Sequence, residues 1–124
     1  MSQPQAQGTK TQVSVVICVL DGAQFLAEAI DSVLAQTLAD FELILVDDGS
    51  TDASPAIAQA YAARDRRVVC THHDGHANRG LSASRNAGIA LARADAIALL
   101  DADDVWRPDK LAQQIAILAA PPAI

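Results

Sequence analysis

Four apolar runs of strand length alternate with segments of helical periodicity along this chain, and this alternation limits the fold more than any other feature of the sequence. The runs are rich in β-branched residues and apolar on both faces, as in parallel strands that are covered by helices. They cover residues 13–19, 41–46, 68–70 and 96–100. The alternating order predicts an α/β fold with a mostly parallel sheet, right-handed crossovers and helices on both faces.

The segments between the runs carry helix signals. Residues 25–34 repeat apolar side chains at three- and four-residue spacing. Ser54 offers a capping hydroxyl ahead of Pro55, which suits the first position of a helix that reaches about Arg64. The apolar positions of the last two predicted helices are Leu81, Ile89 and Leu91 within 81–92, and Leu111, Ile115 and Leu118 between Pro108 and Pro121–Pro122.

The length of 124 residues predicts one domain, and 51% hydrophobic residues are enough to bury a core. We expect this domain to cover residues 13–120 and residues 1–12, which are polar, to form a flexible tail without the apolar core of a signal peptide. No apolar run approaches the roughly 20 residues that cross a bilayer. Cys18 and Cys70 each lie in an apolar run, which favours reduced thiols and a cytoplasmic location.

The charge balance excludes one large class of partner. Nine Lys and Arg residues against 15 Asp and Glu residues give a net charge of −6, without a basic block. Proteins that bind nucleic acids normally carry a basic surface, so we exclude DNA and RNA as main partners. An acidic protein that binds an anionic ligand needs a divalent cation or helix N-termini at the site.

Aspartates follow three of the four predicted strands. Asp21 follows the first, Asp47 and Asp48 follow the second, and Asp101, Asp103 and Asp104 follow the fourth. The carboxyl ends of parallel strands meet at one edge of a sheet, where open α/β folds bind their ligands. Two carboxylates spaced as Asp-x-Asp can share one Mg²⁺ or Mn²⁺ while substrate phosphates complete its shell. The alternative is that these acids only cap helices or form ordinary Asx turns.

The predicted connection 71–80 is long and contains three histidines, His72, His73 and His76. Imidazole is a common ligand of zinc, but this spacing matches no closed site. We therefore favour three solvated histidines in a mobile loop over a zinc site. For Trp106 we favour packing beneath the acidic loop over a role in lining a sugar pocket.

Five sequence blocks together resemble the family 2 glycosyltransferases. In order, they are Val13–Ile17, Ser32–Thr37, Phe41–Asp52, Asn78–Gly88 and Leu100–Asp104. The resemblance covers roughly residues 13–118 and is specific as a set, although each block alone is weak. It implies the GT-A fold, in which a Rossmann-like nucleotide-binding half precedes an acceptor-binding half. It also implies transfer of a sugar from a nucleotide sugar to a hydroxyl group, with inversion.

The resemblance also implies roles for individual residues. Asp48 would accept a hydrogen bond from the nucleobase. Asp103 would be the main ligand of Mn²⁺ or Mg²⁺, and Asp101 would lie near the ribose or the metal. Arg85, which together with Asn86 matches an arginine–asparagine pair of the family, would face the diphosphate; the alternative is a solvated helix arginine. Val19 and Asp21 complete the predicted nucleotide-binding set, and UDP is the expected nucleotide.

The chain departs from the family pattern in two places. Cys18 to Asp21 stand where the family usually has proline, a small residue, tyrosine and asparagine, so Leu20 replaces an aromatic ring that could pack against the base. The catalytic base of the family lies in the acceptor half, beyond Ile124. We therefore expect a donor-binding half that is incomplete for turnover. In the full-length enzyme it would act in cell-envelope polysaccharide biosynthesis, at the inner face of the membrane, on an unknown acceptor. The surface that the other half would cover makes self-association an expectation as well.

Other functions fit the sequence less well. A non-catalytic nucleotide-binding module differs only in never having an acceptor half. In haloacid dehalogenase-type phosphotransferases the Asp-x-Asp motif normally opens the fold, whereas here it comes near the end of the sequence. Response-regulator receivers place their acidic pair after the first strand, whereas Asp47 and Asp48 follow the second. A dinucleotide oxidoreductase would carry Gly-x-Gly-x-x-Gly after the first strand, and that motif is missing from the sequence.

Overall fold

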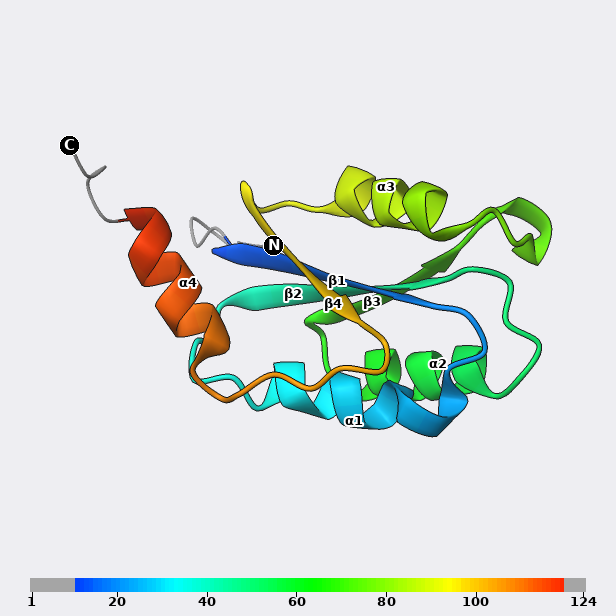
Figure 1. Ribbon diagram of the computed structural model, residues 1–124, viewed down its shortest axis with the longest axis horizontal. Coiled ribbons are helices and arrows are strands. Elements are labelled where there is room, and N and C mark those ends of the chain that lie inside the picture. The colour runs from blue at the N-terminus through cyan, green and yellow to red at the C-terminus, as the bar shows by residue number, and fades with distance from the viewer. Residues whose placement is uncertain (1–10, 120–124) are drawn as a thin grey trace, which may run out of the picture.

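The computed structural model describes residues 11–119, which form a four-stranded parallel sheet with helices on both faces (Figure 1). In chain order the elements are β1 (Val13–Val19), α1 (Ala23–Leu34), β2 (Phe41–Asp47), α2 (Ser54–Arg64), β3 (Val68–His72), the single 3₁₀ turn η1 (Asp74–His76), α3 (Leu81–Leu91), β4 (Ala96–Asp101) and α4 (Lys110–Ala119). The alternation and the parallel sheet predicted from the sequence are confirmed. Most of the predicted tail, the side chain of Leu118 and the Pro121–Pro122 stop lie outside the described residues.

The strands lie in the order β3-β2-β1-β4. The chain therefore moves outward from β1 to β3 and then crosses to the other side of β1 to form β4. Val13 of β1 pairs with Phe41 of β2 and with Ala96 of β4, so the three strands start level. The winding reverses between β1 and β4, and open α/β sheets bind ligands beyond the strand ends at such a switch point.

The two faces of the sheet are packed differently. α1 and α2 cover one face and α3 covers the other (Figure 1). Alternate strand residues divide between them, so that Ile17 and Leu45 join the larger core with Leu26 and Ile30 of α1, whereas Val16 and Val46 join a smaller cluster beneath α3. The partly buried Trp106 packs against the larger core, which confirms its packing role; its place beneath the acidic loop stays a prediction.

Small residues let α3 approach the sheet closely. A Cβ atom on Gly88 would lie only 2.5 Å from Cγ1 of Val16. The buried positions of this helix are Ser84 and Gly88. The large apolar residues of this helix, Leu81, Ile89 and Leu91, do not form its buried face, because they are 51%, 41% and 46% exposed. At this close distance the sheet leaves no room for large side chains.

The structure differs from the predictions at the start of α2, the start of α4 and the end of β3. The capping role predicted for Ser54 is wrong, because Ser54 lies inside α2 and its Oγ accepts a hydrogen bond from the backbone N–H of Gly22 at 3.1 Å. Asp52 instead accepts from the backbone N–H of Ser54 at 2.9 Å. The helix predicted to open at Pro108 begins at Lys110. β3 runs on to His72, which shortens the predicted connection 71–80.

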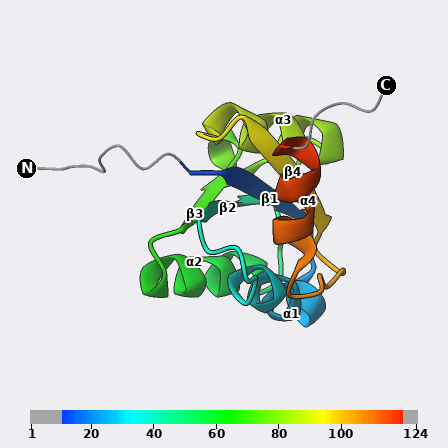
Figure 2. The same ribbon diagram turned by 90° about the vertical axis from the view of Figure 1, so that its left-hand side faces the viewer.

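β4 forms an edge of the sheet, and a helix covers only one of its two faces. Ile97 and Leu99 point to the α3 side of the sheet but remain 40% and 45% exposed. α4 lies against the starts of β1 and β4, where Leu111 is buried and Ile117 is 72% exposed (Figure 2). Helices therefore cover both faces at the centre of the sheet but only one face at β4.

Candidate functional site

A pocket of about 250 Å³ lies at the carboxyl ends of β1 and β2, beside the start of α3. It is lined by Cys18, Val19, Leu20, Asp48, Asn78, Gly80, Leu81 and Ser84. Two of the residues predicted to bind a nucleotide, Val19 and Asp48, thus meet in one pocket. Leu20 and Leu81 give it an apolar wall, and Asp48 gives it a carboxylate.

Asp48 is held by the loop that precedes α3. Its carboxylate accepts hydrogen bonds from the backbone N–H groups of Arg79 at 2.7 Å and Gly80 at 3.0 Å. Its backbone carbonyl accepts from Nδ2 of Asn78 at 3.0 Å. The side chain is only 6% exposed. Asp48 therefore ties residues 78–80 to the end of β2, which sequence reasoning missed, and its contact with a nucleobase stays a prediction.

Gly49 allows these two segments to come together. Its φ of +85° lies in the left-handed region, and a Cβ atom there would lie 2.8 Å from the backbone nitrogen of Asn78. A larger residue would thus face both backbone strain and a steric clash with the loop. The glycine in the Asp-Asp-Gly-Ser block is the sequence signal for this close approach.

Asp47 forms an Asx turn, which is the alternative to metal binding considered for the aspartates at the strand ends. Its Oδ2 accepts hydrogen bonds from the backbone N–H groups of Gly49 at 3.1 Å and Ser50 at 3.0 Å. Asp47 lies beside a second pocket, on the α2 side of the sheet. Its Oδ1 is buried with no hydrogen-bond partner among the described residues. The adjacent aspartates at the end of β2, Asp47 and Asp48, thus border pockets on opposite sides of the sheet.

The histidines of the loop are not all solvated, so that prediction is wrong. The side chain of His73 is 9% exposed, and its Nε2 lies 2.9 Å from Oγ of Ser84 and 3.3 Å from Oδ1 of Asp48. Nε2 of His76 lies 3.0 Å from the carbonyl oxygen of Ser50. His72 and His76 are exposed, so only His73 departs from the prediction. The loop packs back onto the end of β2 because Asp48 supplies acceptors for its backbone.

Asp21 joins two loops at the same edge of the sheet. It adopts a φ of +51°, and its Oδ1 accepts hydrogen bonds from the backbone N–H groups of Thr51 at 2.7 Å and Asp52 at 3.3 Å. It is exposed and is not among the residues that line the Asp48 pocket. Its predicted role in nucleotide binding stays a prediction.

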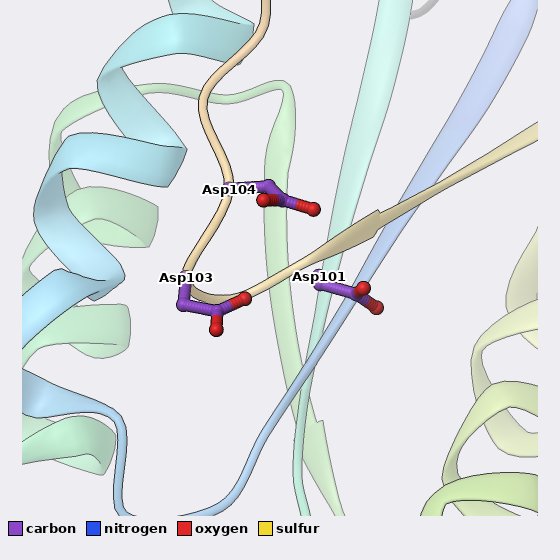
Figure 3. A group of neighbouring side chains, drawn as sticks. All are labelled: Asp101, Asp103 and Asp104. Carbon is purple, nitrogen blue, oxygen red and sulfur yellow. The ribbon is translucent and has the colours of Figure 1, made fainter.

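The aspartates after β4 form an open acidic cluster, which we define as Asp101, Asp103 and Asp104 (Figure 3). Each offers one carboxylate oxygen, and these oxygens lie within 4.8 Å of one another. All three residues are exposed. Within residues 11–119 no other group of three histidine, cysteine or acidic residues meets that distance. The fourth strand therefore ends in a set of hard oxygen donors that fits Mg²⁺ or Mn²⁺.

Arg85 follows Ser84, which lines the pocket, and its side chain reaches the acidic cluster. Its Nη2 is 3.6 Å from Oδ1 of Asp101. Burial raises the pKa of the Cys18 thiol in the pocket wall to about 11; the charge of Arg85 opposes this rise, and the charges of Asp48 and Asp101 add to it. The pocket, Arg85 and the cluster thus share one electrostatic environment. Among the described residues, no helix has both the length and the apolarity needed to cross a membrane.

Two related sequences show what this chain is similar to. The uncharacterized glycosyltransferase EpsJ of Bacillus subtilis (strain 168) is 47% identical over 92 residues, which are 74% of this chain and 26% of EpsJ. The succinoglycan biosynthesis protein ExoO of Rhizobium meliloti (strain 1021) is 38% identical over 112 residues, which are 90% of this chain and 31% of ExoO. The chain thus spans less than a third of the length of these relatives.

Solved structures and a family profile agree with the sequence relatives. The mannosyltransferase PcManGT from Pyrobaculum calidifontis, in complex with GDP-Man and Mn²⁺, matches with a TM-score of 0.79 and 25% identity over 92% of this chain and 34% of its own. The S. aureus TarS fragment 1-349 in complex with UDP shares the fold, with a TM-score of 0.78 and 23% identity over 86% of this chain and 32% of its own. The glycosyl transferase family 2 profile matches residues 14–124. Because that match covers most of the sequence, the chain belongs to glycosyl transferase family 2.

Proposed function

We propose that this chain is the nucleotide-sugar-binding half of a glycosyltransferase that transfers a sugar from a nucleoside diphosphate sugar to an acceptor hydroxyl with inversion. One observation carries the proposal. The Asp48 pocket and the acidic cluster lie on one edge of the sheet, and Arg85, next to Ser84 of the pocket lining, pairs with Asp101 of the cluster. A nucleotide sugar has the matching order of parts, because its diphosphate lies between the nucleoside and the sugar.

The nucleoside would occupy the pocket. Asp48 would accept a hydrogen bond from the base, while Leu20 and Leu81 would flank its ring. The backbone at Val19 and the side chain of Asp21 would lie near the ribose side of the site. UDP is the proposed nucleotide, and PcManGT, whose structure holds GDP-Man, makes GDP the alternative to test.

The acidic cluster would hold Mn²⁺ or Mg²⁺. Asp103 would be the main ligand and Asp101 and Asp104 would flank it, since exposed carboxylates within 4.8 Å of one another suit a hard cation. A bound metal supplies Lewis-acid stabilisation of the negative charge on the leaving diphosphate. The base that deprotonates the acceptor would belong to the acceptor half of the full-length enzyme.

The wider role follows from the relatives. ExoO is named for succinoglycan biosynthesis, so we propose an acceptor among the sugars or lipids of cell-envelope polysaccharide assembly, at the inner face of the membrane. Self-association is the remaining expectation. The exposed Ile97, Leu99 and Ile117 would carry it, because apolar surface favours association. Sedimentation as a monomer at high concentration would contradict this expectation.

Calorimetric titration tests the proposed function. The purified chain is titrated with UDP, GDP and dTDP, each with Mn²⁺ and each with EDTA. We expect one nucleotide to bind in Mn²⁺ and to lose most of its affinity in EDTA. Glu28→Gln, which removes one exposed negative charge on α1, is the matched control and should bind like the wild type. Failure of all three nucleotides to bind in Mn²⁺ would overturn the proposal for this chain.

A further inference from the structure

Arg85 pairs with an aspartate that would also contact a metal ion bound in the acidic cluster. Its Nη2 lies 3.6 Å from Oδ1 of Asp101, and Asp101 belongs to the acidic cluster. Three carboxylates within 4.8 Å of one another repel, and a nearby guanidinium reduces that repulsion. A divalent cation in the cluster would do the same, but with twice the charge. Arg85 and a bound metal would therefore compete for Asp101 in the nucleotide-free protein.

A bound nucleotide diphosphate would change this competition. A ligand that extends from the Asp48 pocket to the acidic cluster would come close to Arg85, because the guanidinium pairs with Asp101 of the cluster and Arg85 follows Ser84, which lines the pocket. Arginine binds phosphate oxygens through two parallel hydrogen bonds, which is a stronger contact than a solvated ion pair. The diphosphate thus offers Arg85 a better partner than the exposed Asp101.

We infer that Arg85 exchanges partners when the donor binds, leaving Asp101 to the metal and turning to the diphosphate, so that nucleotide and metal strengthen each other's binding. The inference rests on the proposed function and adds a residue that couples its two ligands. Coupling of this kind is reciprocal, so a nucleotide that favours the metal must itself be favoured by it to the same degree.

The exchange predicts effects of opposite sign from one substitution. Arg85→Gln removes the competitor of the metal, so Mn²⁺ alone should bind about two- to five-fold more tightly, the range that a solvent-exposed ion pair supports. The same variant loses the phosphate contact, so UDP in saturating Mn²⁺ should bind about ten-fold more weakly. A merely solvated arginine would change neither affinity, and general damage to the fold would weaken both.

The experiment measures Mn²⁺ binding from the electron paramagnetic resonance signal of the free ion, without nucleotide, and then UDP binding by calorimetry in saturating Mn²⁺. Arg66→Gln is the control, because Arg66 is exposed and its loss changes the net charge equally. Arg85→Lys keeps the charge but lacks the planar fork, so Mn²⁺ affinity should stay near wild type while UDP binding weakens. Circular dichroism confirms that each variant is folded.

The outcomes separate the inference from the proposed function. Tighter Mn²⁺ and weaker UDP in Arg85→Gln, with neither change in Arg66→Gln, support the exchange. Equal or weaker Mn²⁺ binding in Arg85→Gln, while the wild type binds UDP in a metal-dependent way, overturns the exchange and leaves the proposed function standing. A wild type that binds neither Mn²⁺ nor UDP overturns both.

Discussion

The ends of β2 and β4 both carry aspartates at the same edge of the sheet. The carboxylates at the β2 end are buried and hydrogen-bonded, whereas those at the β4 end are exposed. Asp47 and Asp48 are 5% and 4% exposed and accept hydrogen bonds from backbone N–H groups. Asp101, Asp103 and Asp104 are exposed, and among the described residues the cationic group that pairs with them is the Arg85 guanidinium, 3.6 Å from Asp101. The difference arises because residues 73–80 cover the end of β2, whereas β4 is an edge strand that runs into an open turn. Carboxylates bonded within the protein stabilise its loops, and open ones remain available to a cation.

The largest expected effect is on stability at the β2 end. Asp48→Ala should lower the free energy of unfolding by about 3 kcal/mol, because the backbone N–H groups of Arg79 and Gly80 lose their charged acceptor. Urea unfolding followed by circular dichroism measures this loss. Asp74→Asn, at an exposed loop position, is the control and should change little. A loss below about 0.5 kcal/mol would show that the 78–80 loop does not depend on Asp48.

At the β4 end, the expected effect is on binding and not on stability. Asp103→Asn should weaken nucleotide binding in Mn²⁺ about 50-fold or more, since the cluster loses its proposed main ligand. Its urea midpoint should match that of the wild type, because the side chain is exposed. Calorimetry and urea unfolding on the same preparation check both statements. A variant with wild-type affinity in Mn²⁺ would remove Asp103 from the metal site.

Glu42 extends the comparison to a buried carboxylate far from the candidate site. Burial by itself would raise the pKa of Glu42, but hydrogen bonds from Ser14 and from Arg93 outweigh it and hold the pKa below its usual value. A lowered folded pKa gives stability that is present above the unfolded pKa of about 4.3 and is lost as the pH falls through the folded value.

Glu42→Gln should therefore cost about 1–2 kcal/mol of unfolding free energy at neutral pH and progressively less below about pH 4. Urea unfolding of the two proteins at neutral and acidic pH measures the difference. Glu28→Gln, on the exposed surface of α1, should show no such pH dependence. A deficit that stays constant with pH would show that the ionised form of Glu42 has no special contacts.

Asp21 gives the smallest expected effect on stability. It combines features of both strand ends, because it is exposed like the acidic cluster but hydrogen-bonded like Asp48. Asp21→Ala should cost about 0.5–1 kcal/mol by removing the acceptor for the backbone N–H of Thr51. Nucleotide affinity should also fall if Asp21 contacts the ribose, as the family resemblance implies. Lower stability with unchanged affinity would assign Asp21 to the loops alone.

The order of the helices and strands could be predicted because apolar periodicity and the aspartates at strand ends are visible within short stretches of sequence. The strands and the acidic positions of the sheet edge follow from such patterns. The buried face of α3 does not follow from them, because the large apolar Leu81 and Ile89 are exposed while the small Ser84 and Gly88 are buried. Pattern methods place large apolar residues inside, but close approach at Gly88 selects small ones.

The partners of the loop residues were equally hidden from the sequence. Asp48 bonds to residues about 30 positions away, and His73 lies against Ser84. Such contacts depend on how close the end of β2 lies to the start of α3 in the fold. No local sequence pattern predicts this spacing. The same holds for Arg85, whose ion pair with Asp101 joins residues that are 16 positions apart in the sequence.

The most direct test of the division between the two strand ends is a crystal structure with Mn²⁺ and UDP, with the metal located from its anomalous scattering. We expect the anomalous peak at the acidic cluster, bonded to Asp103, and the base in the Asp48 pocket with the hydrogen bonds from Arg79 and Gly80 to Asp48 intact. A metal at the β2 end, or a nucleotide bound away from both aspartate groups, would contradict this division.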